Sequence, residues 1–112
     1  NQMNISEFKL FLAQSEFTPK EILEVLAKDE NWYIRASVAQ NSNTQKEILE
    51  IFAKDKDYVI RACVIRNSNI SKEILEILAK DEYSYVRTLV ALNPNTPKEI
   101  HEILAKDEGK YA

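Results

Sequence analysis

The most regularly spaced side chains with chemical potential are three pairs of aspartate and arginine. In every pair the arginine follows the aspartate by six residues. The pairs are Asp29 with Arg35, Asp55 with Arg61, and Asp81 with Arg87. A recurring carboxylate and guanidinium can form an anion-binding site, or the two groups can pair with each other in a bidentate ion pair that has only a structural role.

Other side chains suited to catalysis or metal binding are scarce. His101 is the single histidine and Cys63 the single cysteine, so ligands for a metal site are lacking. One glycine in the whole chain leaves no glycine-rich loop to hold phosphates. Nearly all acidic residues fall in repeating columns, such as Glu24, Glu50, Glu76 and Glu102, which is typical of a solvated face. The sequence predicts a protein that is not an enzyme and that binds no cofactor or metal ion.

An internal repeat predicts the elements that carry these side chains. The tetrad Lys-Glu-Ile-Leu at 20–23 recurs at 46–49 and at 72–75, and returns as Lys-Glu-Ile-His at 98–101, each time 26 residues further on. A fixed period of this kind indicates a stacked array of equal units. With one glycine and three prolines, the chain also lacks the residues for many tight β-turns. We therefore expect an all-α fold, an α-solenoid of helix pairs.

Each unit is expected to contain a helix A and a helix B joined by short polar turns. Three units begin with a capping-box pattern, two of them with proline at the first helical position. The capping residues expected there are Thr18, Thr44 and Thr96. In the third unit Asn69 or Ser71 takes this role. Helix A is predicted to end at about Lys28 and to be buried on several sides, while helix B follows an acidic turn and ends near Gln40.

The repeat divides a single domain, residues 1–112, into five segments. Residues 1–17 form an N-terminal half-unit, because Phe8 and Leu12 align with the core positions Ile34 and Val38 of helix B. The segments that follow are the full repeats 18–43, 44–69 and 70–95 and the C-terminal partial repeat 96–112. His101 replaces a leucine in that last repeat, as expected where a terminal repeat has less neighbour to pack against.

The recurring pattern R-x-x-V-A-x-N-P-N-T-P-x-E-I-L-x-x-L-A-K-D is best preserved from Arg87 to Ile100. It resembles the leucine-rich repeat variant family, a relative of HEAT-like repeats, over essentially the whole chain. The resemblance implies a right-handed superhelix in which the loop aspartate and the helix-B arginine link adjacent units, so we interpret the Asp–Arg pairs as a structural ladder. The iron–sulfur cysteine cluster known in that family is not expected here, because Cys63 stands alone.

Asparagines recur in the turns between units. Their side chains can satisfy free backbone groups there. The residues concerned are Asn41, Asn67 and Asn93, with Asn43, Asn69 and Asn95. We therefore assign them to turn structure and not to a binding site.

Helix B contains the positions at which the units differ most. At about 100° per residue, positions 33, 37 and 40 lie within about 60° of one another and point away from Ile34 and Val38. The same stripe continues in the next units through Cys63 and Leu89. Exposed aromatic and leucine side chains of this kind are typical of binding hot spots. The residues predicted to contact a partner are Trp32, Tyr33, Gln40, Tyr58, Arg66, Tyr85, Leu89 and Leu92.

This stripe predicts a module that binds a protein or peptide, with aromatic anchors and with Gln40 and Arg66 as orienting polar groups. Three alternatives remain: a homodimer that covers the stripe, a nucleic-acid-binding HEAT-like module, and a purely structural segment of a longer array. The net charge of −3 and a single arginine on the stripe argue against nucleic acid. A lone cysteine and the lack of a long apolar run predict a cytoplasmic protein outside the membrane.

Overall fold

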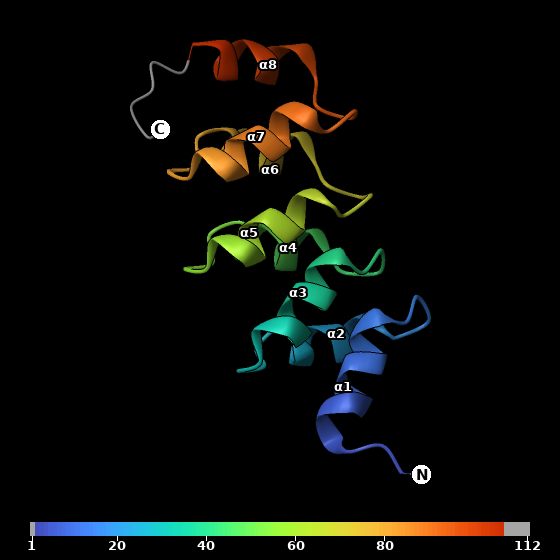
Figure 1. The fold of residues 1–112 in the computed structure, drawn as a ribbon. Coiled ribbons are helices and arrows are strands. Elements are labelled where there is room, and N and C mark those ends of the chain that lie inside the picture. Colours follow the sequence, from blue (N-terminus) through green and yellow to red (C-terminus); the bar gives the residue numbers. More distant parts are fainter. Residues whose placement is uncertain (1, 107–112) are drawn as a thin grey trace.

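The computed structural model describes residues 2–106, which form eight short helices stacked along one axis (Figure 1). The helices are α1 (Ile5–Gln14), α2 (Lys20–Leu26), α3 (Trp32–Gln40), α4 (Lys46–Phe52), α5 (Tyr58–Ile65), α6 (Lys72–Ala79), α7 (Ser84–Leu92) and α8 (Lys98–Ala105). The array measures 53 × 22 × 21 Å. Helices α2, α4, α6 and α8 are the A helices and begin 26 residues apart, whereas α1, α3, α5 and α7 are the B helices. The predicted all-α, solenoid-like array of helix pairs is confirmed.

The hydrophobic core runs through the array, because successive B helices pack against one another and α3, α5 and α7 also pack against the A helices of their own units. Ile34 and Val38 of α3 are fully buried, as the sequence predicted, and so are Ile60 and Val64 of α5. A single pair of helices this short could not enclose a core alone. None of the helices within residues 2–106 has the length and apolar character that a membrane span requires.

The A helices are less enclosed than predicted. Leu23 and Leu26 of α2 are buried, but Ile22 is 39% exposed and Val25 is 68% exposed. The prediction of burial on several sides is therefore wrong for α2, which has only seven residues and ends at Leu26, before Lys28. The degree of enclosure varies along the array, since Ile74 of α6, the counterpart of Ile22, is fully buried.

The predicted capping boxes are also wrong. The three threonines are buried, and each hydroxyl donates a hydrogen bond to a carbonyl oxygen at the end of the preceding B helix. The bonds are Thr18 to Leu12 (2.6 Å), Thr44 to Val38 (2.6 Å) and Thr96 to Val90 (2.7 Å). The A helices then begin one residue later than expected, with Pro19, Gln45 and Pro97 at the N-cap and no capping side chain. In α6 the expected alternative Ser71 is confirmed, because its Oγ accepts from the Ile74 N–H at 3.3 Å.

Candidate partner-binding surface

The polar ladder consists of the aspartates in the turns that follow the A helices and the basic residues of the B helices. Arg61 donates to the two carboxylate oxygens of Asp81 in the next unit, at 2.7 and 3.2 Å, and to the carbonyl oxygen of Asp55 in its own unit at 2.7 Å. The Arg61 and Asp81 side chains are only 9% and 6% exposed. The hydrogen bond to Asp81 raises the pKa of Arg61 above its usual value. This pair therefore joins two units through a contact that is largely shielded from solvent.

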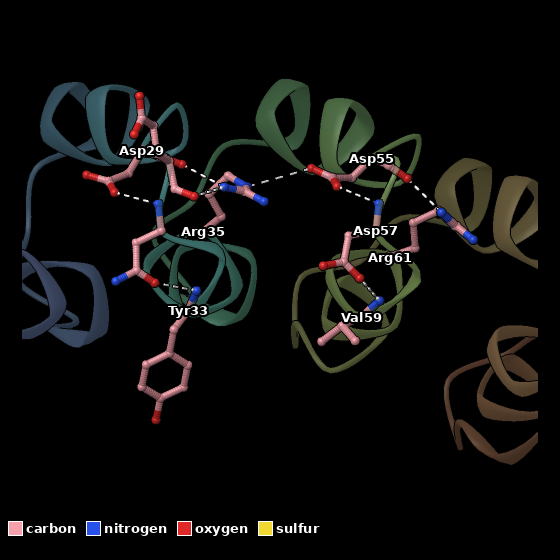
Figure 2. A network of polar contacts seen from close by, with 9 residues as sticks. Asp29, Tyr33, Arg35, Asp55, Asp57, Val59 and Arg61 are labelled. Atoms are coloured by element: carbon pink, nitrogen blue, oxygen red, sulfur yellow. Dashed lines mark hydrogen bonds and ion pairs between the residues drawn. The ribbon is translucent and has the colours of Figure 1, made fainter.

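The ladder is weaker one unit earlier. Arg35 donates to the carbonyl oxygen of Asp29 at 2.7 Å, while its Nε lies 3.9 Å from the Asp55 carboxylate (Figure 2). In the half-unit Lys9 stands in the arginine position and binds Asp29 at 3.0 Å. A backbone hydrogen bond from Asn31, and then the bond from Lys9, hold the pKa of Asp29 below its usual value.

At the other end of the ladder, Arg87 donates to the carbonyl oxygen of Asp81 at 2.7 Å. The aspartate that follows in the repeat, Asp107, lies outside the described residues. The recurring arrangement is an arginine bonded to a carbonyl of its own unit and directed toward a carboxylate of the next. An arginine already paired in this way, as Arg61 is, offers little to a separate anion.

The asparagines form a second link between units. Asn67 Nδ2 donates to the carbonyl oxygens of Ala39 and Asn41 in the preceding unit, at 2.8 and 2.9 Å, and its Oδ1 accepts from the Asn69 N–H at 2.8 Å. Asn41 bonds in the same way to Ala13. The predicted turn role is confirmed by the Oδ1 contact, but the bonds across units were not foreseen. Sequence position alone does not show which backbone lies beside a side chain.

The B helices expose most of the predicted contact residues. Trp32, Tyr33, Tyr58, Tyr85 and Leu92 are between 38% and 72% exposed, Gln40 and Arg66 are exposed, and Leu89 is half-buried. The Tyr33 side chain points away from the ladder in Figure 2. The expected continuous stripe is wrong, however, because its middle positions Ser37 and Cys63 are buried at 8% and 6% exposure. They lie where neighbouring B helices pack together.

A hollow of about 350 Å³ lies along α5, and we call it the tyrosine hollow. It is lined by Tyr58, Val59, Ala62, Cys63, Arg66, Tyr83 and Tyr85. The Tyr58 ring stacks on Tyr83 with centroids 4.8 Å apart and meets Tyr85 edge-on at 6.2 Å. The Arg61 guanidinium lies 5.6 Å from the centre of the Tyr83 ring, a cation–π distance. The ladder thus helps to hold the aromatic cluster in place.

Tyr83 is the member of this cluster that the sequence analysis missed. It occupies the N-cap of α7, where Asn31 caps α3 by accepting from the Tyr33 N–H at 2.9 Å and Asp57 caps α5 in the same manner. Tyr83 makes no such bond. The signal was present in the repeat alignment, since an aromatic residue replaces a favoured capping residue.

A second hollow of about 400 Å³, the leucine hollow, lies between the C-terminal ends of α5 and α7. Its lining consists of Ile65, Arg66, Asn67, Ser68, Leu89, Leu92, Asn93, Pro94 and Asn95. Arg66 lines both hollows and makes no ion pair with any residue from 2 to 106. The two hollows therefore form one surface, the α5–α7 surface, with a cation at its middle.

The other predicted contact residues lie nearer the N-terminus. Trp32 and Tyr33 of α3 pack together with ring centroids 5.5 Å apart, and neither lines the tyrosine or the leucine hollow. Gln40 lines a smaller, polar hollow of about 150 Å³ together with Gln14, Ser37 and Asn41. The structure thus brings together Tyr58, Arg66, Tyr85, Leu89 and Leu92 on the two joined hollows, whereas the three residues of α3 lie outside the lining of both.

The Cys63 thiol lines the tyrosine hollow. Burial raises the pKa of the Cys63 thiol, against smaller opposing effects of Arg66 and Gln40, so the thiol stays protonated and a poor nucleophile at neutral pH. Within residues 2–106, no three His, Cys, Asp or Glu side chains gather as metal ligands.

Comparison of the chain with protein-family models, with curated proteins and with solved structures gave no match. The class shown by the fold is an elongated, all-helical repeat array of the solenoid kind.

Proposed function

We propose that the chain is a non-catalytic repeat module that binds a protein or peptide through the α5–α7 surface. The observation that carries the proposal is the junction of two apolar hollows at one cation, Arg66, which makes no ion pair with residues 2–106. Tyrosine and arginine are enriched in binding hot spots, and the exposed leucines extend the apolar patch around them. Hollows of about 350 and 400 Å³ fit side chains of a partner better than a whole small ligand, because both are open to solvent along the helices.

Membership of the leucine-rich repeat variant family is part of this proposal. The 26-residue period and the link from a helix-B arginine to the aspartate of the next unit support it. A cytoplasmic location also belongs to the proposal, since Cys63 is a free thiol.

A nucleic-acid partner is the less favoured hypothesis. Such a partner needs several cations in one row to neutralise phosphates. Among the described residues, Arg66 is the one cation that lines the two hollows, and Arg61 beside them is already paired with Asp81. A homodimer formed through the same surface is another alternative, and light scattering would detect it as a doubled molar mass.

The proposal is tested with a double variant, Tyr85→Ala with Leu92→Ala, used as bait in a pull-down from the source organism followed by mass spectrometry. Both side chains are about half exposed or more, so thermal stability is expected to change little. The matched control is Val25→Ala with Ile51→Ala, which removes exposed apolar side chains from the A helices. Partners recovered by the wild type and the control but lost by the double variant support the proposal. Equal recovery by all three proteins would reject this surface.

A further inference from the structure

The chemistry of the α5–α7 surface specifies its occupant more narrowly than a peptide in general. We propose that it binds an extended peptide segment with one carboxylate, a proline on one side of it and an aliphatic residue on the other. This inference rests on the proposed function and adds the class of ligand.

The carboxylate is inferred from Arg66. This residue is the C-cap of α5, is exposed, and lacks an ion pair within the described chain, whereas Arg61 is bidentate with Asp81. Its repeat counterparts are Gln40 and Leu92, so the charge belongs to this unit and not to the stacking pattern. A cation between two apolar hollows complements an anion that is itself flanked by apolar groups. A guanidinium suits a carboxylate because it can donate two parallel hydrogen bonds.

The proline is inferred from the tyrosine hollow. Three tyrosine rings line it, and two of them are fixed by stacking at 4.8 Å. Grooves lined by aromatic rings bind polyproline segments, whose extended shape costs little entropy to fix. The aliphatic residue follows from the leucine hollow, whose apolar lining comes from Ile65, Leu89, Leu92 and Pro94.

The length of α5 sets the spacing of the segment. Tyr58 and Arg66 are eight residues apart, which is about 12 Å along a helix. A polyproline helix advances about 3.1 Å per residue, so about four residues cover that distance. The proline is therefore expected within about four positions of the acidic residue. The aliphatic residue is expected on the other side of the acidic residue.

One charge also limits the ligand. The chain carries a net charge of −3, so a polyanion gains nothing from the molecule as a whole. A single carboxylate needs only Arg66. A phosphorylated or nucleic-acid ligand would need a cluster of arginines, because phosphate groups are generally bound by several cations together.

The test is selection from a phage-displayed library of random twelve-residue peptides on four immobilised proteins. They are the wild type, Arg66→Gln, Tyr85→Ala with Leu92→Ala, and the control Lys54→Gln, which removes an exposed charge from another part of the array. We expect the wild type and the control to enrich peptides with proline, an acidic residue and an aliphatic residue in the order described. Arg66→Gln is expected to lose the acidic preference and keep the apolar one.

The selected peptide is then measured by fluorescence polarisation. Arg66→Gln is expected to weaken it about tenfold or more, the usual effect of losing a hydrogen bond to a charged group. Replacing the acidic residue of the peptide by its amide should abolish the difference in affinity between the wild type and Arg66→Gln. Enrichment of peptides without acidic residues, lost only in the Tyr85/Leu92 variant, would overturn the ligand class but keep the binding function. No enrichment on the wild type beyond that double variant would overturn both.

Discussion

The polar ladder and the α5–α7 surface lie on the same units but follow opposite rules. In the ladder an aspartate and an arginine recur at equivalent positions of each full unit. On the surface, by contrast, the counterparts of Arg66 in the other full units are Gln40 and Leu92. Stacking requires sameness, because each unit must fit the next. The surface has no such constraint, and the difference between units is where a partner can be recognised.

The two regions meet at Arg61. Its guanidinium pairs with Asp81 and also lies over the ring of Tyr83. The Arg61–Asp81 contact at 2.7 Å therefore supports the aromatic cluster. Beside the looser contact of Arg35 with Asp55 at 3.9 Å, the position equivalent to Tyr83 is Asp57, which has no ring. Equal residue types in a repeat thus do not guarantee equal contacts.

Among the changes that distinguish the Arg61–Asp81 pair from the Arg35–Asp55 pair, Asp81→Asn is expected to lower the free energy of unfolding most. This change keeps an oxygen for the Tyr83 N–H but leaves the buried Arg61 without its counter-charge. Loss of a buried partner costs about 3 kcal/mol or more. Asp55→Asn is the matched control and should cost about 1 kcal/mol or less, because its contact is long. Urea denaturation measures both free energies of unfolding, and equal values for the two variants would contradict the difference between rungs.

A smaller effect is expected from Asn67→Ala in the asparagine links. The side chain is 2% exposed and satisfies two carbonyl oxygens and one N–H, so its removal leaves buried polar groups unpaired. The expected loss in the free energy of unfolding is about 2 kcal/mol. Asn93→Ala, which loses a longer bond of 3.2 Å to Ile65 at a half-buried site, should cost less. Thermal unfolding followed by circular dichroism would show the order, and the reverse order would be inconsistent with it.

The boundary between scaffold and surface is tested by Tyr83→Asn. Asparagine restores the capping residue found at the equivalent position 31 and should gain about 1 kcal/mol. The change also removes the ring stacked on Tyr58, which is worth about 1 kcal/mol. We therefore expect the free energy of unfolding to stay within about 1 kcal/mol of the wild type, while binding of a peptide selected on the wild type weakens. Unchanged peptide affinity would remove Tyr83 from the proposed site.

The repeat made the fold predictable, because a 26-residue period can be recognised in the sequence without any knowledge of long-range contacts. The direction of Ile34 and Val38 followed from helical geometry alone. The exposure of Val25 did not, since apolar character cannot tell whether a third layer covers a helix. Thr18 shows the same limit, because its hydroxyl prefers a carbonyl six residues earlier to the cap that its sequence pattern indicates.

The candidate surface was predictable only in part, for a related reason. Tyr58, Arg66 and Tyr85 followed from the helix-B stripe, but helical angles placed Cys63 at the centre of an exposed face that the adjacent B helix covers. Tyr83 lies before the helix and outside any helical periodicity. Its contribution depends on the turn that brings its ring onto Tyr58, and a helical wheel cannot represent that contact.

The smallest effect is expected at the N-terminal rung, where Lys9 replaces arginine and pairs with Asp29. Because the folded pKa of Asp29 is lowered, the folded protein holds this carboxylate in its charged form more readily than the unfolded chain does. The stabilisation is therefore present above the unfolded pKa and is lost as the pH falls through the folded pKa. Lys9 is 42% exposed, so solvent limits the contribution to below about 1 kcal/mol.

Asp29→Asn should thus lower the free energy of unfolding slightly at pH 7, and the gap to the wild type should close as the pH falls below about 4. Urea denaturation in steps from pH 7 to pH 3 measures the gap. Lys9→Met is the companion variant: it should narrow the same gap at pH 7, while the part due to the Asn31 N–H remains. A gap that stays constant over this range would mean that the charge of Asp29 contributes nothing, and that apolar contacts and the hydrogen bonds of Asn41 and Asn43 join the half-unit to the array.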